Sequence, residues 1–140
     1  MPADPASTTL RRHLLLAALL GLSLGLGCTS SPDEGCDFID VHLTATQNPD
    51  LAFSWSPAKC GAYQLVVTEG TPIRWLTETF DLSNSLHPPI RYGVHPAGAS
   101  GPTPATLTPG FHYIAVLWRG DVNRTSSFVD TVTFVYSPPD

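Results

Sequence analysis

The chain has 140 residues, of which 12 are acidic and 7 are basic, and its formal net charge is −5. No basic run occurs after Arg12, so the attraction to phosphate that nucleic-acid binding needs is absent, and no nucleic-acid partner is expected. Fourteen prolines and eleven glycines indicate a chain rich in turns.

The N-terminal segment has the order of a secretory signal peptide. Arg11 and Arg12 form a basic start, an apolar run follows from Leu14 to Leu20, and small residues lead to Gly27. The apolar stretch contains glycine and is shorter than the roughly 20 apolar residues of a transmembrane helix. We therefore expect export and removal of residues 1–27.

The residue after the expected cleavage point is Cys28, and this stretch resembles the lipobox of bacterial lipoproteins. The resemblance implies that the Cys28 thiol takes a diacylglycerol, that fatty acids such as palmitate are attached, and that the lipid anchors the chain to a membrane. Thr29 in place of the inner-membrane retention aspartate implies the outer membrane, facing the periplasm or the surface. The alternative is an ordinary signal peptide that leaves Cys28 as the first residue.

After processing, residues 28–140 suffice for one domain and not for two. Residues 28–35 are polar, contain proline and predict a short tether. The domain is expected over residues 36–140.

The first two expected strands form a hairpin. Residues Phe38 to Ala45 alternate, with Ile39, Val41, Leu43 and Ala45 on one side, and Leu51, Phe53 and Trp55 alternate in the same way. Between them, Gln47 to Asp50 contains residue types that favour a turn.

Cys36 and Cys60 lie equally far from the middle of that turn. The hairpin therefore predicts a disulfide, worth about 3.5 kcal/mol for a loop of about 25 residues. The alternatives are two free thiols or a metal site. No histidine stands at ligand spacing to either cysteine, so no metal is expected.

Further strand patterns continue along the chain. They cover Ala62 to Glu69, Ile73 to Thr79 with Trp75, Ile90 to Tyr92, Phe111 to Trp118 and Phe128 to Tyr136, with an irregular stretch at Phe80 to Pro89 and a loop at His95 to Pro104. No segment here has helical periodicity. Seven or eight short strands at this spacing predict an all-β sandwich.

Two stretches resemble the fibronectin type III family: Leu51 to Pro57, with Trp55, and Leu107-Thr108-Pro109-Gly110-Phe111-His112-Tyr113. The resemblance covers about Asp37 to Tyr136. It implies an immunoglobulin-like, fibronectin type III-like β-sandwich of about seven strands, with Trp55 and Leu107 in the core and Tyr113 in a tyrosine corner. It also implies binding or spacing roles and not catalysis.

The stretch from Phe111 to Trp118 is apolar on both sides, so it needs two covers. Tyr113, Ala115 and Leu117 are expected to face the core, which leaves Ile114, Val116 and Trp118 facing outward. The favoured cover is the segment from Leu82 to Pro104. The alternative is a binding face for a protein or glycan, with Trp118 and Trp75 as anchors.

Arg119-Gly120-Asp121 spells the tripeptide that some type III domains present to integrins, although ordinary turn chemistry is the favoured interpretation. His42, His87, His95 and His112 stand without catalytic partners. The sequence thus predicts an envelope-anchored lipoprotein without enzymatic activity or cofactor. Its sandwich would bind a protein or play a structural role. The alternative is a small carbohydrate-binding module that uses exposed tryptophans.

Overall fold

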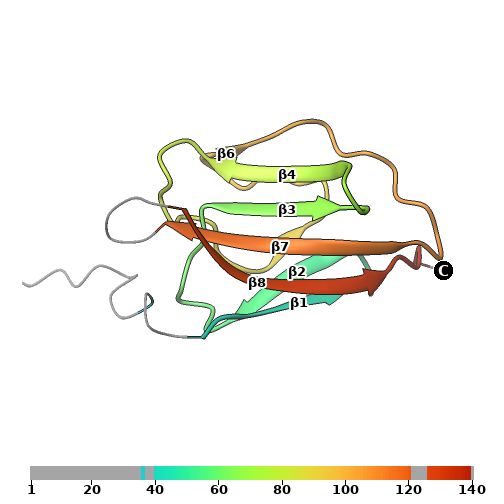
Figure 1. Cartoon of the computed structure of the whole chain (residues 1–140), viewed down its shortest axis with the longest axis horizontal. Helices are drawn as coiled ribbons and strands as arrows, with labels where there is room; N and C mark the ends of the chain where they lie inside the picture. The colour runs from blue at the N-terminus through green and yellow to red at the C-terminus, as the bar shows by residue number, and fades with distance from the viewer. Residues whose placement is uncertain (1–35, 37–39, 121–125, 140) are drawn as a thin grey trace, which may run out of the picture. The chain divides into compact units, whose positions relative to one another are not determined.

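Eight strands form the domain in a computed structural model, which describes residues 36, 40–120 and 126–139 (Figure 1). The expected signal peptide, Cys28, the tether, Ile39 and Asp121 lie outside the described residues. The strands are β1 (His42–Thr46), β2 (Ala52–Ser56), β3 (Gln64–Thr68), β4 (Ile73–Thr79), β5 (Ile90–Arg91), β6 (Ala99–Ser100), β7 (His112–Gly120) and β8 (Ser126–Val135).

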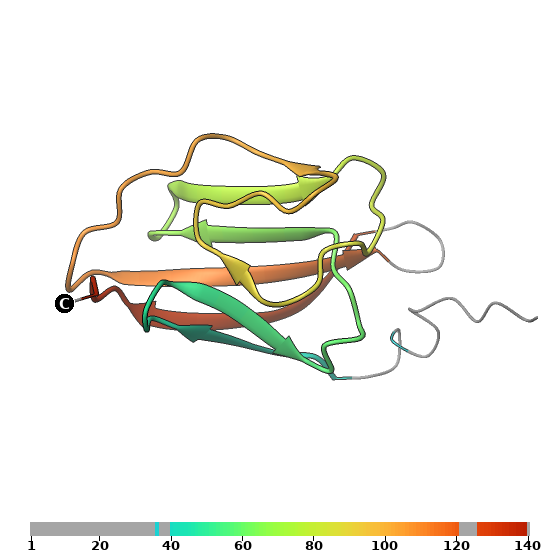
Figure 2. The ribbon, with the colours of Figure 1, turned by 180° about the vertical axis from the view of Figure 1, so that it is seen from behind.

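The strands form two antiparallel sheets that lie in two layers (Figures 1 and 2). One sheet has the order β1-β2-β5, and the other has the order β6-β4-β3-β7-β8. The pairs β2–β5 and β3–β7 join strands that are distant in sequence, so the chain crosses between the layers more than once. The prediction of an all-β sandwich is confirmed.

The core lies between the layers and follows the alternation of the strands. Phe53 from β2 stacks on Trp75 of β4 with ring centroids 6.5 Å apart, and it meets Phe134 of β8 edge-on at 5.7 Å. Leu65 and Leu117 are fully buried in the same core. Burying one such side chain stabilises the fold by about 1.5–3 kcal/mol, so these cross-sheet contacts hold the two layers together.

The segment from Leu82 to Pro104 has a different place from the one predicted. It supplies β5, which pairs with β2 in the three-stranded sheet, and β6, which pairs with β4 at the far edge from β7. It therefore does not cover the outer side of β7, and that prediction is wrong. β6 has only two residues, so the sequence shows no alternating pattern that would predict it. It forms because β4 leaves an edge open with which it can pair.

Side chains connect the edges of β1 and β8. The Asp130 carboxylate accepts a hydrogen bond from the Leu43 amide at 2.8 Å. The Gln47 side chain donates to the Val135 carbonyl at 2.8 Å and accepts from the Ser137 amide at 2.7 Å. These bonds satisfy backbone groups that an open edge would present to another chain.

Candidate functional site

The sandwich has two ends that differ in what holds them. The disulfide end comprises Cys60, the end of β4 at Thr79 and the end of β7 at Gly120. The tyrosine end comprises the start of β4 and the start of β7 at Tyr113. Figure 1 shows the tips of β4 and β7 and the beginning of β1 at the disulfide end.

The disulfide end is closed by the predicted bond between Cys36 and Cys60. Their Cα atoms are 5.5 Å apart, and both residues are buried. Trp55, expected in the core, is buried and donates its indole N–H to the Cys60 carbonyl at 2.6 Å. The hairpin of β1 and β2 has brought the two cysteines together, so the predicted disulfide is confirmed.

Arg119 and Gly120 lie at the same end. The Arg119 side chain is buried and donates to the Gly61 carbonyl. The Asn84 side chain donates to the Gly120 carbonyl and accepts from the Gly120 amide, both at 2.8 Å. Arg119 takes the inward position after Leu117 in β7 and is not displayed on a loop, so the integrin-binding interpretation is wrong for this arginine.

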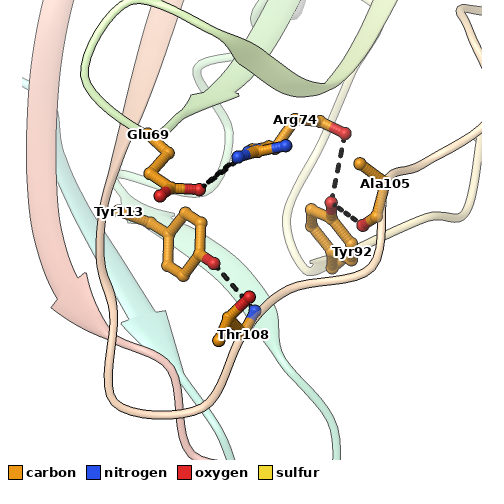
Figure 3. Close-up of polar contacts among 6 residues, drawn as sticks. All are labelled: Glu69, Arg74, Tyr92, Ala105, Thr108 and Tyr113. Atoms are coloured by element: carbon orange, nitrogen blue, oxygen red, sulfur yellow. Dashed lines mark hydrogen bonds and ion pairs between the residues drawn. The ribbon is translucent and has the colours of Figure 1, made fainter.

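At the tyrosine end, the buried hydroxyl of Tyr113 accepts a hydrogen bond from the Thr108 amide at 2.8 Å (Figure 3). Gly110 has a φ of 80°, and the Phe111 amide donates to the Thr108 carbonyl. A type II turn with proline then glycine at its centre has this geometry. The turn carries the chain into β7 and places the Tyr113 ring beneath the preceding segment. The contact has the geometry of a tyrosine corner, and Leu107 beside it is buried.

Tyr92 forms a second hydroxyl contact at this end, which the sequence does not indicate. Its hydroxyl lies 2.7 Å from the Ala105 carbonyl and 3.2 Å from the Arg74 carbonyl (Figure 3). Burial raises the pKa of the Tyr92 hydroxyl to about 12, and the nearby Tyr113 adds to the increase. The protonated hydroxyl thereby ties β5 to the segment that follows β6. Residue type alone could not identify its two carbonyl partners.

A shallow hollow of about 480 Å³ opens at the tyrosine end. Asp50 and Arg91 approach within 3.6 Å at its rim, and Tyr92 and Tyr136 line it. The Tyr92 hydroxyl already has carbonyl partners. The lining residues include no histidine, cysteine or serine.

The outer face of the five-stranded sheet carries three of the predicted binding residues. Leu76, Val66, Val116 and Thr131 stand side by side across β4, β3, β7 and β8. Ile114 is 37% exposed, and Val116 and Trp118 are partly exposed. The middle of this face is therefore apolar and partly accessible, and Gln64 and Glu78 form a polar pair beside it.

The prediction for Trp75 as a binding residue is wrong. Its exposed fraction is 0%, and its ring contacts Phe53 and Tyr92. Side chains alternate between the two faces of a strand. In β4, Trp75, Thr77 and Thr79 are buried, and Leu76 and Glu78 lie on the other face. The carbohydrate-binding alternative thus loses one of its two anchors.

The histidines make local contacts or face solvent. His95 approaches the Thr77 hydroxyl at 3.0 Å, and its ring lies 5.9 Å from Trp75. His87 lies 3.4 Å from the Ala58 carbonyl, and His42 and His112 are exposed. In the part of the chain that the structure describes, no group of three or more histidine, cysteine, aspartate or glutamate residues could hold a metal ion.

Comparisons with known proteins add no relative. The chain matches no protein-family model, no curated protein and no solved structure. Over residues 36, 40–120 and 126–139, no helix is long and apolar enough to cross a membrane.

Proposed function

We propose that the chain is an exported lipoprotein, acylated at Cys28, whose single domain is a fibronectin type III-like sandwich that binds or spaces without catalysing a reaction. The leader from Arg11 to Gly27 and the cysteine that follows support export and acylation. The tether is short and polar, so the domain would stand close to the membrane surface. We place it at the outer membrane.

The fibronectin type III-like assignment depends most on the Tyr113 contact. In immunoglobulin-like sandwiches the tyrosine corner lies near the start of the sixth strand, F, and its hydroxyl bonds to backbone a few residues upstream. The Tyr113 hydroxyl meets the Thr108 amide at 2.8 Å, five residues earlier. If β1, β2 and β5 are strands A, B and E, then β4, β3, β7 and β8 take the order C′-C-F-G, which also supports the assignment.

A binding or structural role fits the described surface better than a catalytic one. The outer face around Val116 is apolar and offers contact area without titratable groups at its centre. An envelope protein is the partner we propose for this face. A glycan-binding role would need flat exposed indoles, and with Trp75 buried it keeps only Trp118.

Metabolic labelling with palmitate tests the anchor. We expect the label in the native chain, none in Cys28→Ser, and unchanged label in Thr29→Ala, a matched control at the adjoining position. Equal labelling of native chain and Cys28→Ser would reject acylation at this residue.

Photo-crosslinking in cells tests the outer face. A photoreactive side chain at position 114 should give a discrete adduct with an envelope protein. The same side chain at position 44, exposed on β1 of the other sheet, should give none. Adducts at both positions or at neither would contradict a specific protein-binding face and leave the spacing role.

A further inference from the structure

Three aromatic residues with solvent-exposed side chains lie at the disulfide end. Phe80 follows β4 and is 88% exposed, and Phe128 in β8 is 55% exposed. Trp118 is partly exposed and meets Phe128 edge-on, with ring centroids 5.9 Å apart. Single exposed apolar side chains are ordinary, whereas several that gather at one end of a sheet indicate a surface for a protein or a membrane.

Backbone contacts connect these residues across the sheet. The Thr79 amide donates to the Tyr63 carbonyl at 2.9 Å, and the Tyr63 amide donates to the Trp118 carbonyl at 3.0 Å. Trp118 pairs in turn with Phe128. The aromatic residues therefore border one end of β4, β3, β7 and β8, a strip about 14 Å wide at the usual strand spacing.

The chain enters the domain at this same end. Cys36 is bonded to Cys60, which lies three residues before Tyr63. This step rests on the proposed acylation of Cys28. Residues 28–35 can reach at most about 26–29 Å when fully extended, and about 16 Å on average as a flexible linker. The lipid anchor would thus hold the aromatic strip near the bilayer surface.

We propose that Phe80, Trp118 and Phe128 form a membrane-contact strip that enters the interfacial layer of the bilayer to which Cys28 is anchored. The amphipathic ring of Trp favours the boundary between headgroups and acyl chains, and Phe is among the residues that interfacial segments bury there. Among the described residues of this end, Lys59 is exposed together with Asp40 and Asp81, and Glu78 is partly exposed. Acidic groups are therefore in excess, and the contact depends on apolar burial and not on attraction to anionic lipid. The domain would then rest on the membrane by this end, with the tyrosine end directed away.

Phe111 provides a matched control. It is 50% exposed, close to the 55% of Phe128, but it precedes β7 at the tyrosine end. Trp118 lies seven positions further along the chain, a distance of about 23 Å in a strand.

Tryptophan quenching in reconstituted vesicles tests the strip. The processed chain is reconstituted in phosphatidylcholine vesicles whose acyl chains carry bromine. Trp55 and Trp75 are buried in the domain core, so quenching reports mainly on Trp118. We expect strong quenching in the native chain, loss of most of it in the Phe80→Ser/Phe128→Ser double variant, and no change in Phe111→Ser. The quenching should also be insensitive to salt.

Absence of quenching in the native chain, or equal quenching in the double variant, overturns the strip. A near-ultraviolet circular dichroism spectrum identical to the native one establishes that the double variant is folded. The mass of the N-terminal peptide separates this inference from the proposed function. Acylated Cys28 without quenching rejects the strip alone, whereas quenching without acylation supports the strip and rejects the anchor.

Discussion

The two ends of the sandwich are held by different physical means. At the disulfide end a covalent bond joins Cys36 to Cys60 across a separation of 24 residues. At the tyrosine end the hydroxyls of Tyr113 and Tyr92 bond to the backbone of passing segments. A disulfide acts mainly by restricting the unfolded chain, whereas a buried hydroxyl acts in the native state alone.

The difference matters because β7 connects both ends. Tyr113 stands at its start, and Gly120, held by Asn84, stands at its end. Loss of the disulfide should lower the stability of the whole domain, since the unfolded chain becomes freer. Loss of a hydroxyl should have a smaller effect, since one hydrogen bond is removed and the strand pairs remain.

The largest expected effect is that of the disulfide. The double variant Cys36→Ala/Cys60→Ala should lose about 3.5 kcal/mol of unfolding free energy, because the unfolded chain regains the entropy of a loop of about 25 residues. Urea denaturation monitored by tryptophan fluorescence measures the loss. Reductant should destabilise the native chain and leave the double variant unchanged. A loss below about 1 kcal/mol would mean that the disulfide end is held by packing.

The second effect concerns Asn84. Asn84→Ala should cost about 1–3 kcal/mol, because the amide and the carbonyl of Gly120 lose their partners together. Equilibrium denaturation measures it, and Ser85→Ala, at the exposed next position, should change stability by less than about 0.5 kcal/mol. Equal stabilities of Asn84→Ala and Ser85→Ala would show that water replaces the asparagine.

The third effect tests the Tyr113 contact. Tyr113→Phe keeps the ring in the core and removes the hydroxyl that accepts from the Thr108 amide, so we expect a loss of about 1 kcal/mol. Thermal unfolding followed by circular dichroism detects it. Thr108→Ala should leave the melting temperature unchanged, because the donor is the backbone amide and not the Thr108 side chain. An unchanged melting temperature in Tyr113→Phe would show that the Tyr113 hydroxyl does not stabilise this end.

The last effect belongs to Tyr92; it is as large as that of Tyr113 at neutral pH and becomes smaller as the pH rises. Its pKa in the folded chain is about 12 against an ordinary 10.0, so the unfolded chain loses its proton first as the pH rises. The stability that Tyr92 contributes is therefore complete below pH 10 and declines between about pH 10 and 12. Tyr92→Phe should be less stable than the native chain at pH 8 by about 1 kcal/mol, the value of one hydrogen bond.

The gap between the native chain and Tyr92→Phe should narrow toward pH 11.5, because the native chain alone loses this contribution. Urea denaturation of both proteins at the two pH values measures the gap. A gap that stays constant with pH would contradict the raised pKa of the Tyr92 hydroxyl.

Much of the architecture could be predicted from local pattern. The alternation of Leu51, Phe53 and Trp55 predicts the inward side of β2, and all three are buried. The turn between β1 and β2 and the spacing of Cys36 and Cys60 predict the disulfide. These features depend on residues that are close in sequence, so the sequence alone is enough to predict them.

The same alternation was not enough to place the aromatic residues on the surface. Trp75 is an exposed anchor only in the alternative of a binding face, and it is the largest fully buried side chain among the described residues. Phe80, in a stretch that the sequence predicts to be irregular, is 88% exposed. Alternation predicts that two faces exist, but it does not say which of them meets the other sheet. In β4 that depends on Phe53, which comes from another layer.

The polar contacts of the tyrosine end show most clearly what the sequence alone does not predict. The stretch from Leu107 to Tyr113 carries enough local information to predict a turn and a buried tyrosine, because proline, glycine and tyrosine stand within seven residues. The partners of Tyr92 are 13 and 18 residues away, and the place of the segment from Leu82 to Pro104 depends on the open edges of β2 and β4. Local residue types set the turns and the alternation of the strands. The packing of distant segments selects the edges, the buried face and the hydroxyl partners, because those interactions exist only when both sheets are in place.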